Sequence, residues 1–316
     1  MTDCLVYFFT GFLDSGKTTA ICSWVDSEGF RDKKVLILST EEGEEEYNET
    51  TIPHTKPVVV QIETEEVTKE KMFALDKEYK PDVIFMEWNG SVSPAEFFEK
   101  VDVPRRWALA AAVVVVDATT YADYYRNMQP IFADYYRFCD TCIFNRVDPE
   151  IHNIPKLRGS VKSLNNGINL NFMDKNSQIL DISDYLPYDL SLNPCNIEAD
   201  DFGLFYTDAL DNYKKYNGKV ISLIGQAVVF REFKNKAFAL QRQAYTCCAD
   251  DIGQLNVLCF HEYGKNFPVG QWLKVTGEIR YFEEKQQDGT PIAVPCLQVK
   301  DYSITSAPEN PMITFS

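Results

Sequence analysis

The chain has 316 residues, of which 45% are hydrophobic and 25% are charged, and its formal net charge at pH 7 is −16. This length predicts two domains, and the composition is ordinary for a folded globular protein. Residues 218–316 hold ten basic and ten acidic residues, so the first 217 residues carry the whole net charge. Because neither part has the basic surplus that duplex DNA or an anionic membrane attracts, we expect no nucleic-acid partner.

The sequence has no feature typical of a secreted or membrane-spanning protein. Its nine cysteines are scattered along the chain, and the N-terminus lacks a charged segment followed by a cleavage site. The longest apolar run, residues 107–116, is about ten residues long, which is too short to cross a bilayer. We therefore expect a cytoplasmic protein with reduced thiols and no transmembrane segment.

Short runs rich in Val and Ile alternate with longer amphipathic stretches in the first half of the chain. The expected strands are residues 5–10, 34–39, 58–62, 83–87, 113–117 and 142–145. The expected helices are residues 16–27, 65–79, 93–100, 120–136 and 155–165. Continuous rather than alternating apolar strands are typical of a parallel sheet covered on both faces. The pattern predicts an α/β domain with a doubly wound, mainly parallel sheet.

The pattern changes in the second half of the chain. A helix is expected at residues 205–216, and five strand-like runs follow from residue 218, with a hairpin turn at Asp288–Gly289 between the last two. Five strands in so short a region favour a small OB-like β-barrel. The expected organisation is an α/β domain over residues 1–198, a linker and helix over 199–217, and a C-terminal β domain over 218–316.

A phosphate-binding loop follows the first expected strand. The pattern Gly11-x-x-x-x-Gly16-Lys17-Thr18 is a Walker A motif, in which backbone N–H groups and a helix N-terminus surround a phosphate. Lys17 can reach the β- and γ-phosphates, and the Thr18 hydroxyl can bind Mg²⁺. The alternative is a coincidental glycine turn. The predicted phosphate-binding residues are Gly11, Phe12, Leu13, Asp14, Ser15, Gly16, Lys17, Thr18 and Thr19, and the fold is that of a P-loop NTPase.

Two further motifs stand at the ends of expected strands. Glu87 ends one strand and is followed by Gly90, so it can hold Mg²⁺ while Gly90 approaches the γ-phosphate. Asn145 ends another and is followed by Asp148, whose carboxylate can accept from both donors on the guanine base. In isolation each motif also fits a strand followed by an ordinary loop. Together with the Walker A motif, their order is the layout of a GTPase.

These motifs resemble the CobW family of metallochaperone GTPases, which are related to HypB, UreG and MeaB. The resemblance rests on TGFLDSGKTT, EWNG, VVVVDA and NRVD, and spans residues 5–170. It implies that Lys17 and Glu87 are catalytic and that Thr18, Glu41 and Glu87 bind Mg²⁺. It also implies that Asn145, Arg146, Asp148 and Asn165 contact the base of GTP or GDP, with Gly90 near the γ-phosphate.

One feature of that family is absent. CobW proteins typically carry a Cys-x-Cys-Cys motif for transition metals before the Glu-x-x-Gly motif, but no cysteine lies between Cys22 and Glu87 here. The same region holds six glutamates in the nine residues 41–49. Clustered carboxylates favour Mg²⁺, Ca²⁺ or Mn²⁺ over the metals that thiolates select. A solvated switch loop is the favoured interpretation of this glutamate run.

Other cysteines offer two candidate metal positions. Cys139 and Cys142 are spaced as a ligand pair, but their apolar neighbours favour two core thiols. In the C-terminal domain a Zn²⁺ or other transition-metal site can be drawn from several side chains, with half-buried reduced cysteines as the favoured alternative. Its candidate ligands are Cys247, Cys248, Cys259 and His261.

The C-terminal region also resembles YcgQ-like bacterial proteins associated with permeases, on the segments GKVISLIGQAV, CCADD, WLKVTGEI and APENPMITF. This resemblance implies a protein client or a membrane permease as partner, and a homodimer is a further expectation. The leading hypothesis is a slow, Mg²⁺-dependent GTPase switch for metal delivery or for regulating a transport partner. The alternatives are a non-catalytic, guanine-nucleotide-dependent binding module and a P-loop ATPase or kinase.

Overall fold

The structure is a computed structural model that describes residues 3–41, 43, 45–165, 167–182, 185–230, 236–245, 252–261, 268–285 and 291–313. The chain divides into two compact units. Unit 1 comprises Met1–His152 and Gly167–Ile182, and unit 2 comprises Asn153–Asn166 and Ser183–Ser316. The predicted domain boundaries at residues 198 and 217 stay a prediction.

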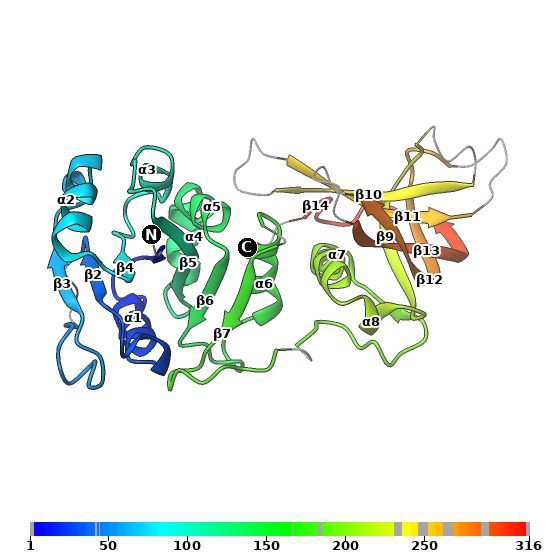
Figure 1. Ribbon diagram of the computed structural model, residues 1–316. Coiled ribbons are helices and arrows are strands. Elements are labelled where there is room, and N and C mark those ends of the chain that lie inside the picture. The colour runs from blue at the N-terminus through cyan, green and yellow to red at the C-terminus, as the bar shows by residue number, and fades with distance from the viewer. Residues whose placement is uncertain are drawn as a thin grey trace. The chain divides into compact units, whose positions relative to one another are not determined.

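Unit 1 is built on a parallel sheet with the strand order β3-β2-β4-β1-β5-β6-β7 (Figure 1). The strands are β1 (Cys4–Thr10), β2 (Val35–Ser39), β3 (Val58–Gln61), β4 (Val83–Glu87), β5 (Trp107–Asp117), β6 (Thr141–Asn145) and β7 (Asn169–Phe172). The predicted parallel α/β sheet is confirmed. The seventh strand was not predicted, because its four residues, Asn-Leu-Asn-Phe, carry little of the Val and Ile that marks the others.

Helices cover both faces of this sheet, with α1 on one side and α2 to α5 on the other (Figure 1). They are α1 (Lys17–Val25), α2 (Lys69–Tyr79), α3 (Ala95–Phe98), α4 (Tyr121–Asn127) and α5 (Gln129–Phe138). The single helix predicted over 120–136 is wrong in one respect, since it is two helices that meet at Met128. Pro130 lies in the first turn of α5, where its missing N–H is tolerated, whereas inside one continuous helix it would remove a hydrogen bond.

The core of unit 1 follows the alternation of side chains along β1. Phe9 points to the α1 side and meets Trp24 with ring centroids 5.2 Å apart. Its neighbour Phe8 points to the other side and packs on Phe97 at 5.4 Å. Both phenylalanines are fully buried, so β1 is fixed on two faces and its C-terminal end is held where the Walker A loop begins.

Unit 2 contains a closed five-stranded barrel with the order β9-β10-β11-β13-β12, in which β9 pairs with both β10 and β12. Only the β11–β13 pairing within the barrel is parallel. The strands are β9 (Val220–Val228), β10 (Ala237–Tyr245), β11 (Ile252–Phe260), β12 (Trp272–Lys285) and β13 (Pro291–Ile304). The predicted small barrel of OB-like type is confirmed. The predicted turn at Asp288–Gly289 lies outside the described residues, between the paired ends Lys285 and Pro291.

Unit 2 also has three helices and two short strands among its described residues. They are α6 (Ile154–Lys162), α7 (Phe202–Asp211), α8 (Tyr213–Tyr216), β8 (Cys195–Asn196) and β14 (Met312–Ile313). Asp208 on α7 is buried and accepts hydrogen bonds from Arg158 on α6 and from Tyr216 on α8. This carboxylate therefore ties the three helices of the unit together. No helix in the described part of the chain is long and apolar enough to cross a membrane.

A buried arginine joins the barrel to the C-terminal segment. Arg242 is 1% exposed and donates to the carbonyl oxygens of Ala199, Asn310 and Pro311 at 3.0, 2.8 and 3.1 Å. Its guanidinium also lies over the ring of Trp272, 5.5 Å from the centroid. Burial lowers the pKa of this guanidinium, and each of its three nitrogens donates to one of these carbonyl groups in place of water.

We expect Arg242→Leu to lower the free energy of unfolding of unit 2 by about 3 kcal/mol, because each carbonyl left unpaired costs about 1 kcal/mol or more. Arg280→Leu is the matched control, since Arg280 is 53% exposed and pairs with Glu278 on the surface. Its effect should stay below about 1 kcal/mol. The unfolding of unit 2 in each variant is measured by urea titration, with hydrogen exchange of peptides from the barrel as the readout. If both variants lose the same free energy of unfolding, the buried contacts of Arg242 with the carbonyl groups are not the cause of the loss.

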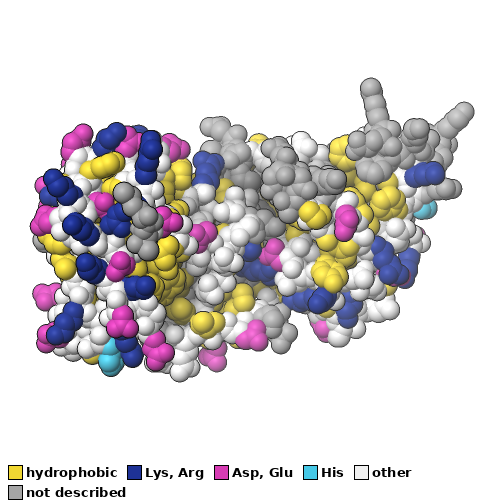
Figure 2. Space-filling model, in the orientation of Figure 1, with side chains coloured by type: hydrophobic (Ala, Val, Ile, Leu, Met, Phe, Trp, Pro, Cys, Tyr) yellow, Lys and Arg dark blue, Asp and Glu magenta, His cyan; other side chains and the backbone are white. Residues whose placement is uncertain are grey.

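Acidic and basic side chains are intermixed over the face of unit 1 in view in Figure 2. On this face of unit 1 neither acidic nor basic side chains form one continuous patch.

Candidate nucleotide site

The Walker A loop connects β1 to α1, as the motif predicted. Gly16 precedes α1 with a φ of 102°, in the left-handed region that favours glycine. A Cβ at this position would lie 2.5 Å from Nδ2 of Asn145. Asn145 itself donates to the Ser15 carbonyl oxygen at 3.1 Å. The loop thus allows the close approach of β6, and the predicted base-binding Asn145 holds the loop from the other side.

The first turn of α1 is prepared for an anion. Gly16, at the N-cap, provides no side-chain cap, and the first turn contains no acidic residue. Uncapped N–H groups and the positive end of the helix dipole therefore face the end of the loop. Thr19, in this turn, donates its hydroxyl to Glu45 at 2.9 Å. The site attracts negative groups, and in this structure carboxylates supply them.

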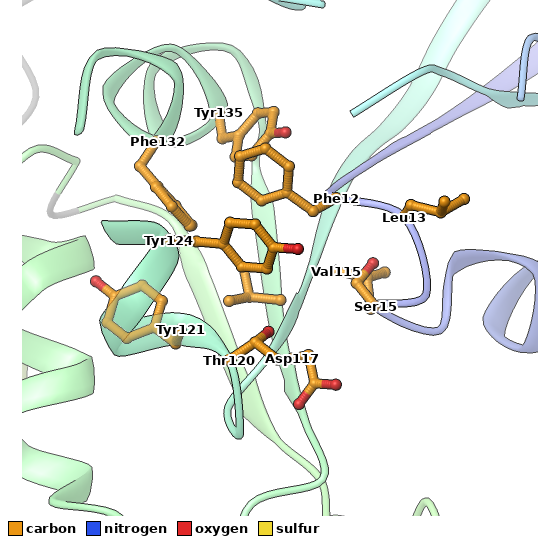
Figure 3. Close-up of a pocket in the computed structure, with 11 residues that line it drawn as sticks. Phe12, Leu13, Ser15, Val115, Asp117, Thr120, Tyr121, Tyr124, Phe132 and Tyr135 are labelled. Carbon is orange, nitrogen blue, oxygen red and sulfur yellow. The ribbon is translucent and has the colours of Figure 1, made fainter. Parts of the chain in front are cut away.

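Aromatic side chains support the loop from outside, as Figure 3 shows. The Phe12 ring stacks on Tyr124 with centroids 4.6 Å apart and meets Phe132 and Tyr135 edge-on at 5.5 and 5.8 Å. Leu13 points away from this cluster and is 51% exposed. Because the three partner rings come from α4 and α5, these helices fix the position of the loop relative to the sheet.

Lys17 is buried and is paired with a carboxylate. Its Nζ donates to the carbonyl oxygens of Gly11 and Phe12 at 2.7 and 3.0 Å and lies 2.5 Å from Oε2 of Glu41. Lys17 and Glu41 are 3% and 12% exposed. A phosphate is the group that a P-loop lysine is suited to bind. Glu41 therefore supplies to Lys17 the negative charge that a phosphate would supply, whereas the sequence suggested Glu41 as an Mg²⁺ ligand or switch residue.

Glu87 stands at the C-terminal end of β4 with both carboxylate oxygens engaged. Oε1 accepts from the Thr18 hydroxyl at 2.7 Å, while Oε2 accepts from Ser39 at 2.8 Å and from Tyr47 at 2.7 Å. Glu87 is only 4% exposed. Burial and the charge of Glu87 raise the pKa of Tyr47, so its phenol stays a donor.

The donors around Glu87 fit Mg²⁺. A hydroxyl and a carboxylate are hard oxygen ligands of the kind that Mg²⁺ takes beside phosphates. Thr18 and Glu87 present such oxygens 2.7 Å apart and line the same cavity of about 130 Å³, together with Gly16, Lys17 and Glu41. The residues predicted for phosphate and Mg²⁺ binding are thus brought together.

Three side chains of this site were not predicted to take part. Ser39 and Tyr47 bind Glu87, and Glu45 binds Thr19. The glutamate run did mark Glu45 as part of a switch loop. A hydroxyl at the end of β2 gave no comparable signal, because serine is common at strand ends.

The predicted base-binding segment follows β6. Arg146 donates from Nη1 to the Asp14 carbonyl oxygen at 2.9 Å and to Oδ2 of Asp117 at 2.6 Å, so its guanidinium lies along the Walker A loop. Asp148 is exposed, and its Oδ1 accepts from the N–H of Glu150 at 3.0 Å. Its carboxylate is accessible to a ligand at the same edge of the sheet as the loop.

Residues 5–171 match the family model of the CobW/HypB/UreG nucleotide-binding domain, which is more than half of the chain. The chain belongs to the CobW/HypB/UreG family. Residues 173–314 match the DUF1980 C-terminal domain. No match among the curated proteins is significant. Members of this family are typically GTPases, and membership implies nucleotide binding.

Solved structures show similarity to each part of the chain. HypB from Archaeoglobus fulgidus is 18% identical over 56% of this chain and 84% of that chain, with a TM-score of 0.40. HypB from Helicobacter pylori, in complex with nickel, is 18% identical over 55% and 80%, also with a TM-score of 0.40. The single-stranded DNA-binding protein Rim1 from S. cerevisiae mitochondria is 13% identical over 28% and 97%, with a TM-score of 0.21. At these identities the similarities concern the fold alone.

Two predicted positions remain open in this CobW/HypB/UreG protein. Asn165 belongs to unit 2, where its N–H donates to the Val161 carbonyl oxygen at 3.0 Å, so its role at the base stays a prediction. Gly90 packs directly on the loop, because a Cβ there would lie 1.9 Å from the Gly11 carbonyl oxygen. Tyr135 donates its hydroxyl to the Gly90 carbonyl oxygen and holds this contact from α5.

The cysteines of this family member do not form a metal group within the described residues. No three His, Cys, Asp or Glu side chains there are placed to hold a metal ion. Cys139 and Cys142 are buried, as the core interpretation predicted, and burial raises the pKa of both thiols. Cys259 is buried in the barrel core with its pKa raised in the same way, and His261 meets Tyr302. Cys247 and Cys248 lie outside the described residues, so the C-terminal metal site stays a prediction.

Proposed function

We propose that the chain is a Mg²⁺-dependent GTPase that works as a slow switch. One observation supports this proposal above others. Lys17 and Thr18, the two P-loop side chains suited to phosphate and Mg²⁺, are held by the carboxylates of Glu41 and Glu87 at 2.5 and 2.7 Å. A buried lysine and a buried carboxylate at a helix N-terminus form a charged site of the kind that phosphoryl transfer requires.

The roles of the residues follow from these contacts. Lys17 would offset the charge that develops on the transferred phosphoryl group, and the backbone N–H groups of residues 11–19 would orient the phosphates. Thr18 and Glu87 would hold Mg²⁺, which when bound neutralises phosphate charge. Glu87 can instead position the attacking water, since Tyr47 and Ser39 already fix its other oxygen.

The segment that follows β2 would respond to the nucleotide. Glu41, Glu45 and Tyr47 all lie on it, and they contact Lys17, Thr19 and Glu87 respectively. A phosphate that binds Lys17 must displace Glu41, because both groups use the same ammonium. Binding and hydrolysis of GTP would thus move this segment between two arrangements, as in other switch loops.

Guanine selection is tested by Asp148→Asn. We expect the Kd of fluorescently labelled GDP to rise at least about tenfold. The side-chain amide of asparagine has only one oxygen, so it cannot accept from both N–H groups of guanine as a carboxylate does. Asp123→Asn, an exposed change on α4, should leave the Kd unaltered. Titrations of GDP and ADP with Mg²⁺ measure this. Tighter binding of ADP than of GDP by the unmodified protein would reject the GTPase assignment in favour of an ATPase or kinase.

The purpose of the cycle is proposed to be metal delivery or insertion, from family membership. The Helicobacter pylori relative was solved in complex with nickel. Because this chain lacks the Cys-x-Cys-Cys motif, its cargo site must differ from that of typical CobW proteins. We expect purified full chain to bind Zn²⁺, Co²⁺ or Ni²⁺ stoichiometrically, measured by elemental analysis and chelator competition. If the purified chain binds none of the three metals, metal delivery is rejected. The proposed function is then the regulation of a protein client or permease without metal.

A further inference from the structure

Strand β3 is unusual for a parallel sheet because it is exposed. Val58 and Val59 are 44% and 40% exposed, whereas all five residues of the neighbouring β2 are buried. Parallel strands are normally covered on both faces. Val59 is in register with Ile37, which belongs to the core under α1, so Val59 extends that apolar face beyond the helix. An apolar strip therefore reaches the surface at the edge of the sheet.

The backbone of β3 is also available on its outer side. It stands at the edge of the sheet and pairs only with β2 among the described strands. The N–H of Ile62 donates to the Ser39 carbonyl oxygen at 3.1 Å. Since successive residues of a strand direct their N–H groups to opposite sides, those of Val59 and Gln61 point away from β2. Such an edge can accept one more strand.

A groove lies beside this strand. The connection from β2 to β3 has no helix among its described residues, although a helix usually covers such a crossover. The groove has a volume of about 540 Å³, and Tyr47, Ile52, Thr55, Pro57 and Val59 help to line it. The Thr55 hydroxyl is buried there without a hydrogen-bond partner in the described structure. This hydroxyl adds a polar group to the wall of the groove beside Val59.

The charge around the groove selects the partner. The segments before and after β3 expose Glu45, Glu46, Glu49, Glu63, Glu65 and Glu66. Lys56 is the one lysine or arginine between residues 45 and 66. A second copy of the same acidic edge would be repelled, whereas a basic segment would be attracted.

We propose that the groove beside β3 binds an extended segment of a client protein in which apolar residues alternate with Lys or Arg. The segment adds a strand to β3, places apolar side chains against Val59 and Ile52, and meets the surrounding glutamates with its cations. Tyr47 lines the same groove and donates to Glu87 at 2.7 Å, so an occupant that contacts Tyr47 also affects the nucleotide site. This coupling rests on the proposed function, whereas binding of the segment does not.

A phage-displayed peptide library, selected on the nucleotide-free full chain and counter-selected on a Val59→Glu variant, tests the proposal. We expect enriched sequences that alternate apolar residues with Lys or Arg. An enriched peptide, labelled and followed by fluorescence anisotropy, should bind Val59→Glu at least about tenfold more weakly. Ile151→Glu is the matched control at another exposed apolar position of unit 1, 76% exposed, and should bind like the unmodified chain.

Two outcomes would overturn the proposal. One is that the selection enriches acidic peptides, or that no enriched peptide loses affinity in Val59→Glu. The other is a concentration-dependent dimer of the full chain that Val59→Glu abolishes in sedimentation, which would assign the edge to a second copy. For the coupling, bound peptide should change the Kd of labelled GDP about fivefold in the unmodified chain and not in Tyr47→Phe. If the unmodified chain binds labelled GDP but no basic peptide, the groove proposal is rejected and the proposed function stands.

Discussion

GTP turnover by Lys17→Ala is expected to fall by at least about a hundredfold, because removal of one positioned donor to a developing negative charge has that effect in comparable sites. Lys17 lines the cavity that contains Thr18 and Glu87, and it is 3% exposed. Its loss removes a charge that water cannot easily replace in so closed a position. The rate is obtained from the release of inorganic phosphate in the presence of GTP and Mg²⁺, measured at several protein concentrations.

Lys33→Ala provides the control, because Lys33 is exposed and lies before β2. It should hydrolyse GTP at the unmodified rate. Lys17→Ala also leaves Glu41 without its cation, so folding must be checked by thermal unfolding of both variants. Glu41→Ala separates the effects: if Glu41 only competes with phosphate for Lys17, labelled GDP binds this variant more tightly. Hydrolysis by folded Lys17→Ala at the unmodified rate would remove Lys17 from the mechanism.

The parts of the site that the sequence predicted are those fixed by local rules. The Walker A residues are consecutive, so their geometry follows from one strand, one loop and one helix. Glu87 and Asn145 were predicted because each ends an apolar strand, and the carboxyl ends of parallel strands meet at one edge of the sheet. This reasoning needs the order of the elements but no knowledge of side-chain packing.

The parts that were not predicted depend on the path of the chain between elements. Tyr47 reaches Glu87 only because the connection after β2 returns across the α1 face, and no periodic pattern marks such a path. The continuous polar and aromatic pattern over residues 120–136 does not show that α4 ends and α5 begins at Met128, with Pro130 in the first turn of α5. Arg242 resembles any exposed arginine of a strand until the C-terminal segment covers it and offers two of its three carbonyl partners. Contacts between residues so distant in sequence leave no local signal.

Gly90→Ala is expected to weaken binding of labelled GDP by at least about tenfold and to lower thermal stability, because overpacking at a close backbone contact costs about 1–3 kcal/mol. A Cβ at Gly90 would lie 1.9 Å from the Gly11 carbonyl oxygen and 2.7 Å from the Cα of Phe12. These are backbone atoms of the Walker A loop, so the loop itself has to move. Stacking of Phe12 on Tyr124 opposes that movement from the other side.

Gly29→Ala is the matched control, since the same methyl group there meets no atom within 4 Å. Gly29 lies in the short 3₁₀ helix Glu28–Phe30, outside the nucleotide site. We expect GDP affinity to stay unaltered and stability to change by less than about 1 kcal/mol. Fluorescence titration and thermal unfolding of both variants compare one methyl group at two positions. If Gly90→Ala binds GDP like Gly29→Ala, close packing of the β4–α3 connection on the loop is not what shapes the phosphate site.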